Sequence, residues 1–298
     1  MSIMRQSHYQ IDNVAWGMEL EGYVQNSLRH CTMDVARADY AHRLGQLLDA
    51  PVLAENSTSY LWHPHRWLVT FDTTIEPPRN GVDIEIKSPI LAPADIELLP
   101  RRLRQIKRSK LQTNNRCALH LHASPLSGQR WSVGQAVGHY KNFRDNLPGI
   151  VEYVDYKLFD TARAPRNPWV EDWQLNNVTT HEELADLICP LPPHSKSETL
   201  LSKLQERRRF QLNVMPMLPV SATDPGKGSH EDRPLAAEDY ETSAPLIRMF
   251  LSMAACSIRG EKFVLNEYAE TVANDREFAL PTPSRPQPQP VGASLARS

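Results

Sequence analysis

Four short segments of the sequence carry side chains that could perform chemistry, and the first contains Glu19 and Glu21 around Leu20. In a strand, residues two apart project from the same face, so these carboxylates would lie side by side. Adjacent carboxylates repel each other unless a cation lies between them, and hard divalent cations prefer oxygen ligands. The pair predicts a cation site, and an exposed strand face is the alternative.

The second segment combines Asp72 with Asp83 and Glu85. Glu85 would share a strand face with Asp83 and Lys87, because the intervening positions are apolar. We expect some of these charged side chains simply to be solvated.

The third segment is a histidine pair, His120 and His122, on either side of Leu121. Two imidazoles on one strand face suit metal or phosphate binding. A structural role for both histidines is the alternative.

The fourth segment contains Glu231 and Arg233, which share a face if it is a strand. The carboxylate could bind a metal, and the guanidinium could contact phosphate or carboxylate in a bidentate manner. A surface ion pair is the alternative. Upstream, Arg209 and Asn213 frame another predicted strand.

These residues must be positioned by strands and helices, which hydrophobic periodicity predicts. Strands are expected at 14–24, 66–73, 82–88, 116–124, 209–217 and 228–236. Helices are expected at 33–49, 94–113, 132–147, 180–188, 198–208, 238–257 and 261–274. The third of these helices is expected to stop at Pro148-Gly149.

The order of these elements predicts the fold class. The strands lack a regular βαβ rhythm and several alternate polar with apolar residues, which favours an antiparallel sheet in an α+β fold. Helices would cover one face, and the carboxylates and imidazoles would lie on the open face. We expect one catalytic domain over residues 1–278 with a loop-rich excursion at 160–197, followed by a disordered proline-rich tail at 279–298.

The composition excludes several classes of protein. The chain has 298 residues and a net charge of −2, which does not favour nucleic-acid binding. The four cysteines, Cys31, Cys117, Cys189 and Cys256, show no paired spacing that would indicate disulfides or a cysteine zinc site. There is no apolar leader and no run of about 18 apolar residues that could cross a membrane. We expect a cytoplasmic protein with reduced cysteines.

Taken in order, the motifs resemble the amidoligase family, carboxylate–amine ligases related to glutamine synthetase and glutamate–cysteine ligase. The resemblance runs from about Trp16 to Ala255 and rests on GMELEGY, WLVTFDTTIE, VDIEIKSPIL, CALHLHAS, RRFQLNVMP and HEDRPL. Ala118 and Asp232 depart from the family pattern, which usually has glycine and an apolar or aromatic residue there.

The resemblance implies a glutamine-synthetase-like curved, mostly antiparallel sheet with the active site on the face away from the helices. It implies ATP and Mg²⁺ as cofactors and an acyl phosphate that an amine attacks. The implied metal ligands are Glu19, Glu21, Glu85, His120 and Glu231. The implied nucleotide or phosphoryl contacts are His122, Arg209 and Arg233. The implied catalytic residues are Asp72, Glu85 and Arg233, with Asp72 binding metal or orienting the amine. Arg163 and Arg166 could bind an anionic group of the substrate.

The substrates would be a small-molecule or peptide carboxylate and an amine, and a homo-oligomer is possible. Three other functions stay open. One is a phosphotransferase that moves phosphate from ATP to nitrogen. Another is a zinc hydrolase using His120 and His122, although no further histidine pair completes such a site. The last is a catalytically silent nucleotide-binding protein.

Overall fold

The structure is a computed structural model that describes residues 8–25, 32–55, 64–72, 74–114, 116–126, 129–153, 167–191, 210–218, 229–237 and 239–281. Several predictions fall outside these ranges. They concern the helix at 198–208, the tail beyond its first three residues, and Arg163, Arg166 and Arg209.

Within the described ranges, seven strands form one open sheet in the order β2-β3-β4-β1-β5-β7-β6. The strands are β1 (Val14–Gln25), β2 (Val52–Ala54), β3 (Trp67–Thr70), β4 (Gly81–Lys87), β5 (Ala118–Pro125), β6 (Leu212–Asn213) and β7 (His230–Ala236). All neighbouring strands pair antiparallel except β2 and β3, which are parallel. The prediction of a mixed fold with a mostly antiparallel sheet is therefore confirmed.

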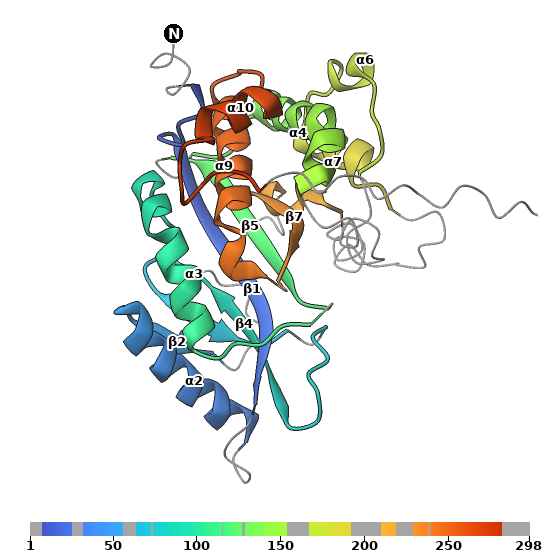
Figure 1. Cartoon of the computed structure of the whole chain (residues 1–298). Helices are drawn as coiled ribbons and strands as arrows, with labels where there is room; N and C mark the ends of the chain where they lie inside the picture. Colours follow the sequence, from blue (N-terminus) through green and yellow to red (C-terminus); the bar gives the residue numbers. More distant parts are fainter. Residues whose placement is uncertain are drawn as a thin grey trace, which may run out of the picture.

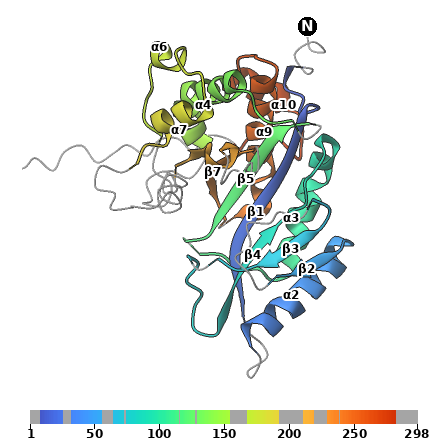
Figure 2. The same cartoon turned by 180° about the vertical axis from the view of Figure 1, so that it is seen from behind.

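The helices lie mainly on one side of this sheet. They are α2 (Met33–Leu48), α3 (Leu99–Arg108), α4 (Val133–Tyr153), α6 (Asp172–Leu175), α7 (His181–Ile188), α9 (Ala244–Ile258) and α10 (Leu265–Val272). In Figure 1, α3 and α9 lie in front of the long strands, and the reverse view in Figure 2 shows β1, β4 and β5 in front of them. Helix α9 contacts β1 and β5, α2 contacts β3 and β4, and α4 packs on α9.

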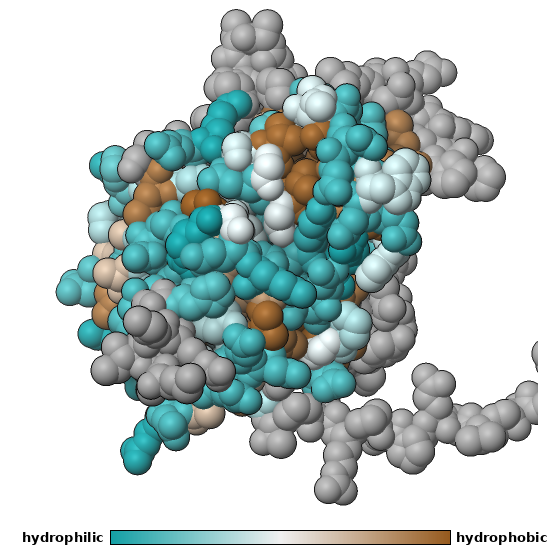
Figure 3. Space-filling model, turned by 90° about the horizontal axis from the view of Figure 1, so that it is seen from above, coloured by the Kyte–Doolittle hydropathy of each residue, from teal (hydrophilic) through white to brown (hydrophobic). Residues whose placement is uncertain are grey.

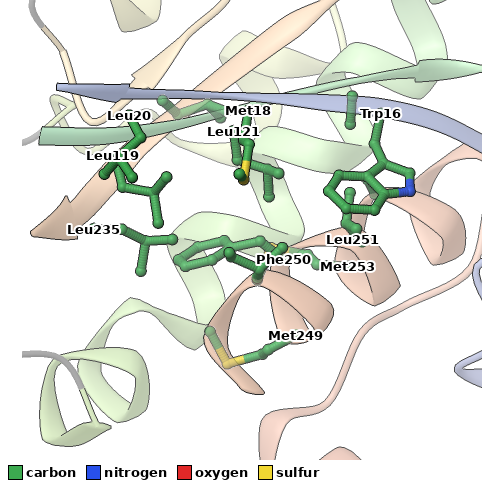
Figure 4. Close-up of a cluster of buried hydrophobic side chains, with 14 of the residues drawn as sticks. Trp16, Met18, Leu20, Leu119, Leu121, Leu235, Met249, Phe250, Leu251 and Met253 are labelled. Carbon is green, nitrogen blue, oxygen red and sulfur yellow. The ribbon is translucent and has the colours of Figure 1, made fainter. Parts of the chain in front are cut away.

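The core lies between the sheet and α9. Alternate residues of β1, including Met18 and Leu20, point toward Phe250 and Leu251 of α9, as Figure 4 shows. Leu119 and Leu121 of β5 and Leu235 of β7 extend the same apolar layer. Because α9 packs against the sheet on one side and α4 on another, residues around most of its circumference are buried.

Helix α4 is longer than the sequence predicts. It continues through Pro148 to Tyr153 instead of stopping at residue 147. A proline inside a helix removes one backbone hydrogen bond, but tertiary contacts hold this segment in place. The Asn146 side chain bonds the backbone of Phe263 and Leu265. A Cβ at Gly149 would meet the Cδ2 methyl of Leu265 at 2.7 Å, so glycine allows this close packing without displacing the Leu265 side chain.

Other boundaries also differ from the prediction. The strand expected at 209–217 is reduced to two residues and followed by a 3₁₀ turn, Met215–Met217, which contains Pro216. The helices expected at 94–113 and 238–257 each begin as a 3₁₀ turn, Pro93–Leu98 and Tyr240–Thr242. The short strand β2 was not predicted.

The surface seen from above in Figure 3 is mostly hydrophilic, with hydrophobic residues in small separate groups. None of the helices in the described ranges has the length and apolar character that crossing a membrane requires. Cys117, Cys189 and Cys256 are buried, and Cys31 lies outside the described residues.

Candidate active site

Polar side chains from β1, β4, β5, β6 and β7 meet on the face of the sheet opposite to α9. Along β1, Met18 and Leu20 point toward α9 (Figure 4), so alternation directs Glu19 and Glu21 to the other face. The register then places the remaining residues opposite one another. Glu21 pairs with Glu85, Glu19 with Lys87 and His120, and Glu231 with His122 and Asn213.

Glu19, His120 and Glu231 form the tightest group, which we call the central cluster. One donor atom of each residue lies within 4.8 Å of the other two. His120 Nδ1 lies 3.2 Å from Glu231 Oε1 and 3.6 Å from Glu19 Oε2. All three residues are buried. Neither ring nitrogen of His120 makes a hydrogen bond with a described residue, and both face carboxylate oxygens.

A second group, Glu21, Glu85 and Lys87, adjoins the central cluster on the β4 side. Lys87 Nζ lies 3.1 Å from Glu85 Oε2 and 3.7 Å from Glu19 Oε1. Glu21 Oε2 accepts a hydrogen bond from the Ala118 backbone amide, and Glu21 Oε1 lies 3.8 Å from His120 Nε2. Lys87 therefore supplies a fixed positive charge inside a row of acidic side chains.

Two residues orient Glu231 from either side. Arg233 Nη1 donates to Glu231 Oε1 at 2.9 Å, and the Arg233 side chain is 22% exposed. Asn213 Nδ2 donates to Glu231 Oε2 at 2.6 Å, while Asn213 Oδ1 accepts from the Met215 amide. Asn213 thus fixes one carboxylate oxygen, and the partly exposed guanidinium of Arg233 can also meet an anionic ligand.

His122 lies beside a small cavity at the edge of this face. Its Nε2 is 3.5 Å from Glu19 Oε1, and its Nδ1 is 3.5 Å from Ser229 Oγ. The cavity has a volume of about 150 Å³ and is mostly apolar. It is lined by Ala15, Trp16, Gly17, Ile90, His122, Ala123, Ser124 and Ser229.

The two aspartates from the second sequence segment have different positions. Asp72 follows β3 and accepts a hydrogen bond from the Thr74 amide. Its charge is one of the contributions that raise the pKa of Glu21 and Glu85, so it belongs to the same electrostatic environment. Asp83 is instead paired with Arg37 at 2.8 Å and stays outside the site.

Burial and mutual repulsion shift the pKa values of the carboxyl groups. Burial, then the charge of Glu19, raises the pKa of Glu85 to about 8, although Lys87 opposes this. Burial also raises the pKa of Glu21 above its ordinary value. Burial would raise the pKa of Glu231 as well, but Arg233 and then His120 outweigh it and lower that pKa to about 2. The face therefore holds a proton on Glu85 at neutral pH.

Burial and neighbouring charges also have opposite effects on the pKa of His120. Burial and Arg233 disfavour its imidazolium form, yet the carboxylates of Glu19, Glu231 and Glu21 outweigh them and raise its pKa. A group of acidic side chains that retains protons at neutral pH can exchange them for a metal ion. Carboxylate oxygens with one imidazole nitrogen suit a divalent cation such as Mg²⁺ or Mn²⁺.

The structure brings together all the predicted site residues that it describes, with Asp72 at the margin. The sequence predicted that Lys87 shares a strand face with Glu85, but Lys87 was not among the predicted site residues. Its position two residues after Glu85 in an alternating strand was the signal that it would share this face. The contact of Asn213 with Glu231 was not predicted, because β6 and β7 are separated in sequence and their register is set by tertiary structure.

Residues 12–151 match a family model described as "Putative amidoligase enzyme". Over these residues the chain is similar to the amidoligase family. The matched amidoligase segment contains β1 to β5, and with them Glu19, Glu21, Asp72, Glu85, His120 and His122. Glu231 and Arg233 lie beyond the amidoligase match, and the sheet places them next to it in space. A comparison with curated proteins found no match.

Proposed function

We propose that this protein is an ATP- and magnesium-dependent ligase that joins a carboxylate to an amine. The observation that carries the proposal is the convergence of Glu19, His120 and Glu231 beside Arg233 on one face of the sheet. The amidoligase match supports a ligase. An acidic face opposite the helix-covered face supports the finer proposal of a glutamine-synthetase-like architecture.

Two groups of residues would hold the magnesium ions. Glu19, His120 and Glu231 would bind one ion, and Glu21 with Glu85 would bind a second. Magnesium held by these residues would supply positive charge against the transferring phosphoryl group. Binding there requires the proton of Glu85 to leave, because a protonated carboxyl group is a poor ligand.

Other residues of this face would bind the substrates. The apolar cavity beside His122 suits the base of a nucleotide, whose phosphates would then extend toward the central cluster. Arg233 keeps part of its guanidinium exposed and would stabilise charge on phosphoryl oxygens. Asp72 would orient the amine. Arg209, Arg163 and Arg166 stay predicted contacts of the nucleotide or an anionic substrate.

The proposed reaction has two steps. A carboxylate oxygen of the first substrate attacks the γ-phosphorus of ATP. The bond from that phosphorus to ADP breaks, so ADP leaves and an acyl phosphate forms. The amine nitrogen then attacks the acyl carbon, and phosphate leaves with one of the original carboxylate oxygens. Asp72 would accept the proton that the amine nitrogen loses.

The origin of the phosphate oxygen gives a sharp test. Purified protein with ATP and Mg²⁺ is screened against pools of ¹⁸O-labelled carboxylates and of amines, including amino acids, polyamines and short peptides. We expect ADP formation that needs both pools, ¹⁸O in the released phosphate, and an amide detected by mass spectrometry. A phosphorylated amine formed without any carboxylate would overturn the ligase and favour the phosphotransferase.

Variants link the activity to this face. Glu231→Gln should lower turnover at least about 100-fold, since even the loss of a residue that only supports a metal ligand costs 10- to 100-fold. Glu97→Gln, an exposed glutamate of the Pro93–Leu98 turn, serves as the matched control and should keep full activity. Equal activity of both variants would place the chemistry elsewhere.

A further inference from the structure

A second group of potential metal ligands lies on the opposite side of β7. Alternation along β7 sends Glu231 toward the active-site face and its neighbours His230 and Asp232 toward the core. There they meet His139 of α4. His230 and Asp232 are completely buried, and His139 is 1% exposed. The proposed ligase chemistry uses none of these three side chains.

The three side chains converge on a common point. His230 Nε2 lies 3.0 Å from Asp232 Oδ2, and His139 Nε2 lies 3.7 Å from Asp232 Oδ1. One donor atom of each residue lies within 4.8 Å of the other two. Trp131 packs its ring against both imidazoles and closes the site from one side.

The hydrogen bonds around His139 determine where its proton lies. Ser257 Oγ gives its hydrogen to the Met253 carbonyl at 2.7 Å. It also accepts from Asn142 Nδ2, whose orientation is set because Asn142 Oδ1 accepts from the Phe263 amide. Ser257 Oγ has no second hydrogen to donate, so His139 Nδ1 must donate the 3.2 Å bond between them.

Because Nδ1 of His139 donates to Ser257, Nε2 is the ring nitrogen that faces Asp232 Oδ1. Neither Nε2 nor Asp232 Oδ1 has a hydrogen-bond partner within the described part of the chain. Their separation of 3.7 Å is longer than a hydrogen bond allows. A cation placed between these two buried atoms would give both of them a partner.

The spacing suits a metal ion. Zinc binds nitrogen and oxygen at about 2.0–2.2 Å, which in tetrahedral geometry places two ligand atoms about 3.3–3.5 Å apart. Two imidazole nitrogens and one oxygen of Asp232 provide three donors. An ion there would replace the 3.0 Å hydrogen bond between His230 Nε2 and Asp232 Oδ2. The bond from His139 Nδ1 to Ser257 is the second contact by which zinc-binding histidines are usually oriented.

We propose that His139, His230 and Asp232 form a buried structural zinc site that fastens α4 to β7. An ion there would hold the strand that presents Glu231 to the active-site face. Ser257 and Asn142 also line a surface pocket of about 610 Å³, so the second layer of this site reaches solvent.

Metal analysis of the untagged full-length protein tests the site. Protein purified from zinc-supplemented cells should contain about one tightly held zinc per chain by mass spectrometry. His139→Gln should lose it, whereas His120→Gln, which removes a ligand from the opposite face, should retain it. His42→Gln changes an exposed histidine of α2 and is the matched control.

His139→Gln could fail to fold, so a second measurement uses proteins that keep His139. Exchange of zinc for Co²⁺ in the wild type and in His120→Gln should produce the visible absorption of a tetrahedral cobalt site, and a chelator should lower the melting temperature of both. The zinc proposal is overturned if the wild type holds no zinc and gives no tetrahedral cobalt spectrum. It is also overturned if zinc is lost in His120→Gln but kept in His139→Gln. Because these readouts do not involve ATP or turnover, they are independent of the proposed ligase activity.

Discussion

Replacing Glu85 with glutamine should change how the stability of the metal-free protein depends on pH. Burial, then the charge of Glu19, raises the pKa of Glu85 from an ordinary value of 4.5 to about 8. The folded protein therefore holds this proton more tightly than the unfolded chain. The resulting stabilisation is complete below pH 4.5 and is lost as the pH rises through 8.

The size of the effect follows from the shift. Each pKa unit corresponds to about 1.4 kcal/mol, and the difference between 8 and 4.5 is 3.5 units. The upper limit of the lost stability is thus about 5 kcal/mol. Glutamine keeps the shape and polarity of the side chain but cannot ionise, so Glu85→Gln should not lose this part of its stability.

Urea unfolding of the wild type, Glu85→Gln and the control Glu97→Gln at about pH 5, 7 and 9 in EDTA measures this difference. The free energy of unfolding of the wild type and of the control should fall by several kcal/mol more than that of Glu85→Gln. Added Mn²⁺ should reduce the fall in the wild type, because the cation replaces the proton. If the free energy of unfolding fell by the same amount with pH in the wild type and in Glu85→Gln, the reasoning would be refuted.

Four further predictions concern the same face. Lys87→Met should lower the free energy of unfolding in EDTA by about 3 kcal/mol, because it leaves buried carboxylates without their partner, and should tighten Mn²⁺ binding measured by calorimetry. A weaker Mn²⁺ affinity in this variant would contradict the role of Lys87 as a counter-charge. Asn213→Ala should weaken Mn²⁺ binding by about 10- to 100-fold through loss of the contact that orients Glu231, and an unchanged affinity would argue against it. Arg233→Met should lower kcat by about 100- to 1,000-fold with a smaller effect on Mn²⁺ affinity, and a variant changed only in KM would contradict that role. Mn²⁺ affinity of the wild type should rise with pH through about 8, since the proton of Glu85 must leave, and a pH-independent affinity would count against this exchange.

The strands that carry the site could be predicted from the sequence because apolar and polar residues alternate along them. The segments at 14–24, 82–88 and 116–124 each alternate apolar with polar residues, and all three form strands within one or two residues of the expected bounds. Alternation also indicated which carboxylates share a face. It could not indicate the register, which sets Glu19 opposite both His120 and Lys87.

Tertiary contacts explain the predictions that were wrong. Pro148-Gly149 is a stop signal in an isolated helix, but α4 continues because Asn146 and Gly149 are engaged by the 263–265 segment. The predicted strand at 209–217 is broken after Asn213, whose side chain bonds the Met215 amide in place of a strand neighbour. Neither effect is visible in local sequence preference.

The burial of two histidines beside Asp232 could not be predicted from the sequence either. His139 lies in a predicted helix, while His230 and Asp232 lie in a strand about 90 residues later, and only the packing of α4 against β7 brings them together. In the sequence, Asp232 stood out solely as a departure from the amidoligase pattern.

The central claim is that Glu19, His120 and Glu231 hold a divalent cation. Anomalous diffraction from crystals soaked in Mn²⁺ with a non-hydrolysable ATP analogue tests it most directly. We predict a manganese peak bound by these three side chains, with the nucleotide phosphates adjoining it. The account would be contradicted if manganese and phosphates were ordered in the crystal but bound away from this cluster.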